Sequence, residues 1–109
     1  MPNPLALTGK QARYLRALCH HQSPVVQVGR AGVTEALLQE VEGALLAHEL
    51  IKIRISGDAP TDATEAAREL AGELQAGVAQ VIGHTVALYR PHPTSPKINL
   101  PSAKRPDKA

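Results

Sequence analysis

The stretch from residue 24 to residue 34 constrains the fold most, because a strand signal leads directly into a helix signal. A short run rich in valine ends at the loop Gly29-Arg30-Ala31-Gly32, and Thr34 is a favourable N-cap for the helix that follows. Glycine lets a ligand approach the backbone, and a helix start adds unpaired N–H donors and the positive end of its dipole. The stretch is therefore a candidate anion site, in which Arg30 adds a charge. The same spacing is common at tight turns, so it does not decide the function alone.

The first helix is expected before this stretch. Thr8 and Gln11 form a capping-box signal, and the helical pattern reaches about residue 21. Its apolar side chains fall on one side, while Lys10, Arg13 and Arg16 fall on another. Taken alone, such a basic stripe is most often a solvated helix face.

Two further helices follow the loop. The second covers residues 34–48, and the third is capped by Thr61 or Asp62 and ended by Gly77. Apolar residues recur in all three helices at intervals of three and four. The side chains expected to be buried are Ala12, Leu15, Leu18, Cys19, Leu37, Leu38, Val41, Ala44, Leu45, Ala63, Ala66, Ala67, Leu70 and Leu74.

The clearest strand lies at residues 50–56, where apolar and polar side chains alternate. Lys52 and Arg54 are expected on its more solvated face. The last two strands are expected at residues 78–82 and 85–90, joined by Gly83-His84. The resulting α-β-α-β-α-β-β order predicts a single compact α/β domain with a four-stranded mixed sheet. Its first two strands should be parallel, because a right-handed helical crossover joins them.

The chain divides into three parts by composition. Residues 1–7 are expected to be a flexible N-terminus, and residues 8–91 the folded domain. Residues 92–109 are rich in Pro and Lys and predict an extended tail. Within this tail, Ile98 and Leu100 could pin part of the chain to the domain.

The net charge of +2 hides a separation of charge along the chain. Residues 1–30 carry four basic side chains and no acidic one, whereas residues 31–51 carry four acidic side chains and no Lys or Arg. Residues 55–76 are again acidic, and residues 77–109 again basic. We therefore expect a basic side and an acidic side, which suits a polyanionic partner. With two Tyr and no Phe or Trp, modules that stack successive bases on aromatic side chains are disfavoured.

No arrangement typical of an enzyme is legible in the sequence. The five histidines lack a recognisable ligand or acid–base context, and no Ser-His-Asp or Cys-His grouping is evident. The acidic row along the third helix is expected to be a solvated face rather than a metal site, so we expect no metal and no cofactor. Cys19 cannot form an internal disulfide, and neither a leader nor an apolar run long enough to span a membrane is present. These features predict a soluble cytoplasmic protein.

Six segments occur here in a set order: Leu7-Thr8-Gly9-Lys10-Gln11, Leu15-Arg16, Pro24 through Glu35, His48 through Ile53, Gln80 through Pro91 and Lys97 through Pro101. Together they resemble the YhbY-type CRM domain, and the resemblance spans roughly residues 5–100. One departure is His84, where the family often has Lys, so a fixed cation is not expected in the hairpin.

The resemblance implies an RNA-binding α/β domain, related in fold to the C-terminal domain of translation initiation factor three. Its loop is compared with the Gly-x-x-Gly loop by which KH domains hold the nucleic-acid backbone. Stand-alone bacterial members associate with precursors of the large ribosomal subunit, and plant organelle relatives act in group II intron splicing.

With the resemblance added, the hypothesis is a non-catalytic, monomeric RNA-binding protein that assists large ribosomal subunit assembly. Its partner would be ribosomal RNA, without membrane association, and the acidic third helix would face away from the RNA. The candidate RNA-binding residues are Gly29, Arg30, Ala31 and Gly32 in the loop, Lys10, Arg13 and Arg16 on the first helix, Lys52 and Arg54 on the second strand, and Arg90. Two alternatives stay open: a protein-interaction adaptor on ribosomal precursors, and a binder of another structured RNA.

Overall fold

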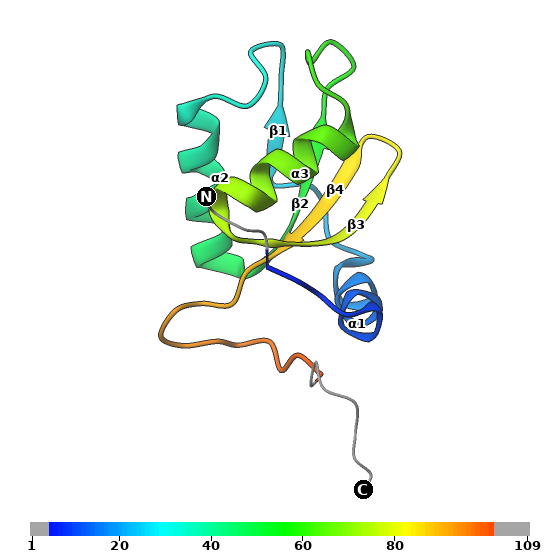
Figure 1. Ribbon diagram of the computed structural model, residues 1–109, viewed down its shortest axis with the longest axis vertical. Coiled ribbons are helices and arrows are strands. Elements are labelled where there is room, and N and C mark those ends of the chain that lie inside the picture. The colour runs from blue at the N-terminus through cyan, green and yellow to red at the C-terminus, as the bar shows by residue number, and fades with distance from the viewer. Residues whose placement is uncertain (1–4, 102–109) are drawn as a thin grey trace, which may run out of the picture.

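A four-stranded mixed sheet forms the centre of the computed structural model, which describes residues 5–101 (Figure 1). Its strands are β1 (Val26–Val28), β2 (Leu50–Ile55), β3 (Gly77–Ile82) and β4 (Thr85–Tyr89), in the order β1-β2-β4-β3. β1 and β2 are parallel, and β4 is antiparallel to both β2 and β3. The predicted single α/β domain with a four-stranded mixed sheet is confirmed.

Three helices cover the sheet: α1 (Gly9–Cys19), α2 (Glu35–His48) and α3 (Ala63–Leu74). α2 and α3 pack on one face, over a core that includes the three isoleucines of β2. α1 packs on the opposite face, where Leu15 joins Leu50 and Tyr89 in a second, smaller core. Because successive strand residues point to opposite faces, Lys52 and Arg54 lie on the α1 side of the sheet. Among residues 5–101, no helix is both long and apolar enough to cross a membrane.

Each helix begins at a capping residue that the sequence predicts. The N-caps are Thr8, Thr34 and Asp62, and in each case the side-chain oxygen accepts a hydrogen bond from the backbone N–H three residues later. The Gln11 side chain completes the capping box of α1. These bonds satisfy donors that a helix start would otherwise leave unpaired, and so they fix where each helix begins.

Two expectations about the helices are wrong. Gly77 does not end α3, because the helix stops at Leu74 and Gln75 takes the left-handed conformation with φ of 55°. Gly77 is instead the first residue of β3, and a Cβ there would lie 2.7 Å from side-chain carbons of Leu7, so glycine permits a close approach. Leu18 is 45% exposed, since α1 turns Leu15 and Cys19 toward the sheet instead.

The start of the described chain is packed, which differs from the flexible N-terminus predicted for residues 1–7. The Leu5 N–H donates to the Ala76 carbonyl at 3.0 Å, and the side chains of Leu5 and Leu7 pack against the core beneath α1. Residues 1–4 lie outside the described part of the chain.

Residues 92–101 form no helix or strand; they bend below the domain toward α1 and are held by two polar side chains (Figure 1), so the extended conformation predicted for the tail is not what these residues adopt. The buried Glu49 carboxylate accepts three backbone N–H groups of this segment, and the Gln11 Nε2 donates to the Pro101 carbonyl at 2.8 Å. The donors to Glu49 are His92, Lys97 and Ile98, at 2.8–3.0 Å. Ile98 and Leu100 pack against the core beneath α1, so their predicted pinning role is confirmed. Residues 102–109 of the predicted tail lie outside the described residues.

Candidate nucleic-acid interface

The loop of residues 29–32 joins β1 to α2 at the edge of the sheet where β1 and β2 both end (Figure 1). The Gly32 N–H donates to the Gly29 carbonyl at 2.9 Å, which closes a tight turn with Arg30 and Ala31 exposed at its corner. Gly32 is buried with φ of 75°, and a Cβ there would lie 2.9 Å from Pro60. Around Gly29, by contrast, no atom of the described chain other than Gly29 itself and its two neighbours in sequence lies within 4 Å of an added Cβ. The turn therefore requires the second glycine, whereas the first leaves the backbone open to a ligand.

Some of the backbone N–H groups expected to bind an anion already donate hydrogen bonds within the protein. The Gly32 N–H is bonded inside the turn, and the Leu37 N–H in the first turn of α2 donates to Thr34 Oγ1 at 3.1 Å. The Arg30 side chain, 86% exposed, is therefore the strongest anion-binding group that the loop presents.

Arg30 has a partner that the sequence analysis missed. Its Nε and Nη2 atoms each lie 3.4 Å from Asp58 Oδ2, in the loop after β2. Ser56 Oγ donates to Asp58 Oδ1 at 2.5 Å, and this bond, followed by the Arg30 contact, lowers the pKa of Asp58. Both partners of the ion pair are exposed, so the pair is weak, and a phosphate can replace the carboxylate. The signal for this contact was present, because parallel neighbours such as β1 and β2 end at the same edge of a sheet.

Lys52 and Arg54 lie on the α1 side of the sheet, as expected from their alternation with isoleucine. Lys52 Nζ is 3.4 Å from the His20 carbonyl just after α1, which links the strand to the helix. Arg54 is exposed, in register with Gln27 on β1 and Thr85 on β4. Both cations therefore occupy the part of the sheet between α1 and the glycine loop.

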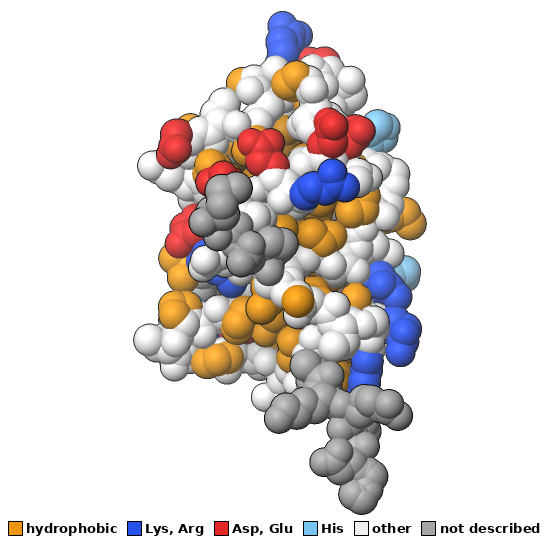
Figure 2. Space-filling view, in the orientation of Figure 1, with side chains coloured by type: hydrophobic (Ala, Val, Ile, Leu, Met, Phe, Trp, Pro, Cys, Tyr) orange, Lys and Arg blue, Asp and Glu red, His pale blue; other side chains and the backbone are white. Residues whose placement is uncertain are grey.

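The basic residues of α1 lie on the same side of the sheet. Lys10 and Arg13 are exposed and Arg16 is half-buried. Figure 2 shows Lys and Arg side chains gathered beside α1, and Asp and Glu side chains gathered over α2 and α3. The predicted basic and acidic sides are confirmed. We use "basic surface" for the set Lys10, Arg13, Arg16, Lys52 and Arg54.

Arg90 does not join the basic surface. Its Nη1 donates to Glu42 Oε1 at 2.9 Å and to the Leu74 carbonyl at 3.1 Å, and its side chain is only 18% exposed. The hydrogen bond from Arg90 lowers the pKa of Glu42 and outweighs the opposing effect of burial. Arg90 thus ties the end of β4 to α2 and to the last turn of α3, on the acidic side of the molecule.

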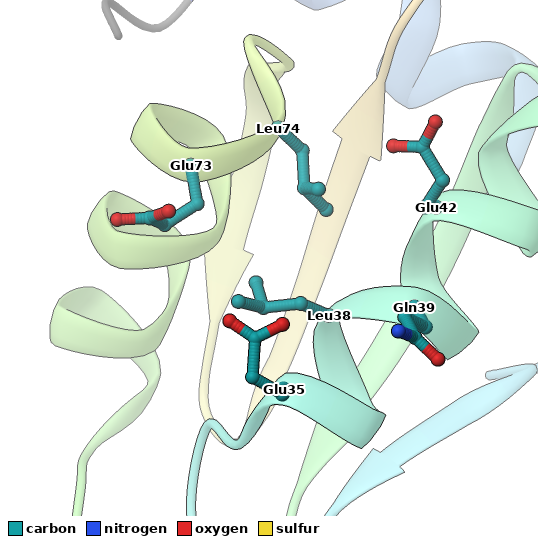
Figure 3. A pocket seen from close by; sticks show the side chains of 6 residues that line it. All are labelled: Glu35, Leu38, Gln39, Glu42, Glu73 and Leu74. Atoms are coloured by element: carbon teal, nitrogen blue, oxygen red, sulfur yellow. The ribbon is translucent and has the colours of Figure 1, made fainter. Parts of the chain in front are cut away.

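A groove of about 320 Å³ lies between α2 and α3 on this acidic side (Figure 3). Leu38 and Leu74 form its apolar part, and Glu35, Glu42 and Glu73 lie around them. Such a groove suits a cationic ligand and repels phosphate. Among residues 5–101, no three His, Cys, Asp or Glu side chains come together as a metal site requires.

Comparison with known proteins gives consistent matches over most of the chain. Residues 7–90 match the CRS1 / YhbY (CRM) domain. "Probable RNA-binding protein YqeI" of Bacillus subtilis is 37% identical over 95 residues, covering 87% of this chain and 99% of the relative. An "RNA-binding protein" of Haemophilus influenzae is 41% identical over 95 residues, covering 87% and 95%. The solution structure of SAV1595 from Staphylococcus aureus, a hypothetical protein described as a candidate RNA-binding protein, matches with a TM-score of 0.75 at 35% identity, covering 88% of this chain and all of that one.

Proposed function

Because this chain belongs to the CRS1 / YhbY (CRM) domain family, we propose that it is a non-catalytic RNA-binding protein that assists assembly of the large ribosomal subunit. The observation that carries the proposal is the basic surface on the α1 side of the sheet, whose member Arg54 lies near the end of β2, the same end of the sheet at which the glycine loop follows β1. RNA binding is supported by the names of its relatives, and the ribosomal role by the resemblance to stand-alone bacterial members. The proposed partner is ribosomal RNA of the large-subunit precursor, bound by a monomer.

The proposed contact is to the RNA backbone. Gly29 admits a phosphate close to the main chain, Arg30 leaves Asp58 to pair with it, and the basic surface holds the neighbouring phosphates. Contacts of this kind position an RNA without reading its sequence. The acidic face over α2 and α3 is repelled by the same polyanion, so only one side of the domain docks productively.

The loop variant Arg30→Asp/Ala31→Asp tests this contact. Both glycines remain, and acids near the start of α2 are tolerated by its dipole, so stability should change little. A phosphate would now face two new carboxylates beside Asp58, and each lost charged contact is worth roughly 1.5–3 kcal/mol. RNA affinity should therefore fall by about tenfold or more. The measurement is a titration of a large-subunit ribosomal RNA fragment at fixed salt, with a melting curve of the same variant; parental affinity in a folded variant would remove the loop from the interface.

Salt dependence separates RNA binding from a protein-adaptor function. If three phosphates of a single strand are neutralised, the slope of log K against log salt should be about −2, because each contact contributes roughly −0.7. The adaptor alternative draws support from the acidic groove between α2 and α3, which suits a basic protein segment. Salt-tolerant binding to a ribosomal protein without RNA would favour the adaptor.

The ribosomal role is tested in cells. The protein should co-sediment with incomplete large subunits more than with mature ribosomes, and crosslinked RNA should be enriched in large-subunit ribosomal sequences. Equal occupancy of both particles would contradict a role in assembly. Enrichment of messenger or transfer RNA would instead favour another structured RNA as the partner.

A further inference from the structure

We infer that a groove beside β1 binds an unpaired nucleotide base, so that the protein selects single-stranded RNA over duplex. This inference rests on the proposed RNA binding and adds a subsite to it. Pro24, Val25, Val26, Gln27 and Arg54 line the groove, which measures about 430 Å³. It lies between the glycine loop and the part of the sheet that α1 covers.

The groove belongs to an uncovered area of the sheet. α1 packs over the end that holds Leu50 and Tyr89, whereas Gln27, Arg54 and Thr85 lie in register nearer the glycine loop. Arg54 and Gln27 are exposed, and Val25 next to them is 51% exposed although it is apolar. Within residues 5–101 the structure gives neither the Gln27 amide nor the Arg54 guanidinium a hydrogen-bond or ion-pair partner. An apolar wall and two polar groups without protein partners therefore face the same space.

These groups match the chemistry of a nucleotide. Pro24 and Val25 offer an apolar wall for the face of a base. The Gln27 amide carries both a donor and an acceptor, the combination that pairs with base edges. Arg54 can stack on a base or hold its phosphate. The volume is near the lower end of the roughly 300–1,000 Å³ of small-molecule pockets, which suits one base and not a duplex.

The position of the groove links it to the backbone contacts. Gly29 follows Gln27 by two residues, which is about 7 Å along a strand, so a nucleotide in the groove has a phosphate within reach of the loop. Bases inside a duplex are stacked and paired, and their edges cannot enter such a groove. Lys52 and Arg54 on the neighbouring strand make this region cationic, which favours RNA over a peptide added to the edge of β1.

The test compares Gln27→Leu with the control Gln39→Leu, which changes the same type of exposed side chain on the acidic side. The probes are fluorescein-labelled ten-nucleotide homopolymers of U, A and C and a blunt ten-base-pair RNA duplex, all at one salt concentration. Gln27→Leu should lose about fivefold to tenfold in affinity for at least one homopolymer and less than twofold for the duplex. Gln39→Leu should change neither.

A second measurement uses the parental protein and does not depend on how a variant folds. A U homopolymer that contains 4-thiouridine should photo-crosslink within residues 24–27 or at Arg54. Three results would overturn the inference while leaving RNA binding in place. Gln27→Leu could lose equal affinity for single strand and duplex, it could lose no affinity, or the crosslinks of the parent could be confined to α1. A parent that binds none of the probes would overturn the proposed function and this inference together.

Discussion

Gly29 and Gly32 have different surroundings, although the sequence presents them as equivalent. Gly32 holds a positive φ and lies against Pro60, so the turn cannot accept a side chain there without strain. Gly29 lies outside the left-handed region and has open space where a Cβ would be. Because the fold does not require glycine at position 29, we infer that its lack of a side chain serves a ligand at the proposed anion site.

Alanine at each position separates these two roles. Gly32→Ala should lower the free energy of unfolding by roughly 1–3 kcal/mol, because it adds strain and a clash with Pro60. Gly29→Ala should change stability by less than about 1 kcal/mol and yet weaken RNA binding severalfold, because its methyl group holds a phosphate away. Chemical denaturation and RNA titration measure both effects. Parental RNA affinity in Gly29→Ala would place the phosphate elsewhere.

Arg54 and Arg90, which lie at opposite ends of the antiparallel pair of strands β2 and β4, make a second contrast. Arg54 is exposed on the basic surface, whereas Arg90 is mostly buried in contacts with Glu42 and the end of α3. Arg54→Met should weaken RNA binding roughly threefold to tenfold, the effect of about one lost phosphate contact, with little loss of stability. Arg90→Met should leave RNA affinity within twofold of the parent and lower the free energy of unfolding by about 1–2 kcal/mol. The expected loss is at the low end for a charged pair because Glu42 is partly exposed. RNA titrations and melting curves of both variants measure the two effects. If Arg54→Met lowered stability and Arg90→Met weakened RNA binding, the roles given to the two arginines would be refuted.

Among the elements, the C-terminal segment depends most on a single side chain. Glu49 closes α2 and uses both carboxylate oxygens to accept backbone N–H groups from residues 92–98. Burial alone would raise the pKa of Glu49, but these bonds and nearby His92 outweigh it, so the pKa lies below the ordinary value of 4.5. The ionised form is therefore the one that holds the segment against the domain.

Glu49→Gln should detach this segment. The amide replaces one acceptor oxygen of the carboxylate by an NH₂ group, which faces the backbone N–H donors of the segment. The free energy of unfolding should therefore fall by roughly 1.5–3 kcal/mol, the scale of a hydrogen bond to a charged group. In the parent, a pKa that is lower folded than unfolded adds stability above pH 4.5, and that stability is lost as pH falls through the folded pKa. Denaturation between pH 3 and pH 7 should give a flatter profile for Glu49→Gln than for the parent. Glu40→Gln, on the exposed face of α2, is the control and should keep the parental profile.

Sequence reasoning predicted the elements better than the contacts between them. Periodicity and capping gave the helices and strands, since these signals are local, and the side of Lys52 and Arg54 followed from alternation with isoleucine. The partners of Arg30, Arg90 and Glu49 were missed, because they lie 16 to 49 residues away along the chain. In the sequence Glu49 is only one of four acidic side chains in residues 31–51, and only the packed fold shows that it is buried.

The whole molecule separates charge across the thickness of the sheet. α1 and the basic surface lie on one side, and the acids of α2 and α3 lie on the other (Figure 2). The molecule measures 51 × 28 × 27 Å along its principal axes, so charges on opposite sides of it are separated by a distance comparable with the Debye length of about 30 Å at 0.01 M salt and beyond the roughly 8 Å at 0.15 M. The acidic side therefore acts on an RNA at the basic surface only when salt is low.

The double variant Glu65→Gln/Glu69→Gln tests how the repulsion between the acidic side and RNA depends on salt, since both side chains are exposed on α3. Removing two distant repulsive charges should raise the association rate with RNA by about twofold at 0.01 M salt and leave it unchanged at 0.15 M, where screening is complete over this distance. Lys10→Gln/Arg13→Gln changes the same number of charges on the basic surface, and should weaken binding at both salt concentrations because direct contacts are lost. Stopped-flow association at the two salts makes the comparison. A gain for the α3 variant that persists at 0.15 M would mean that α3 lies against the RNA, and the orientation proposed for the domain would have to be reversed.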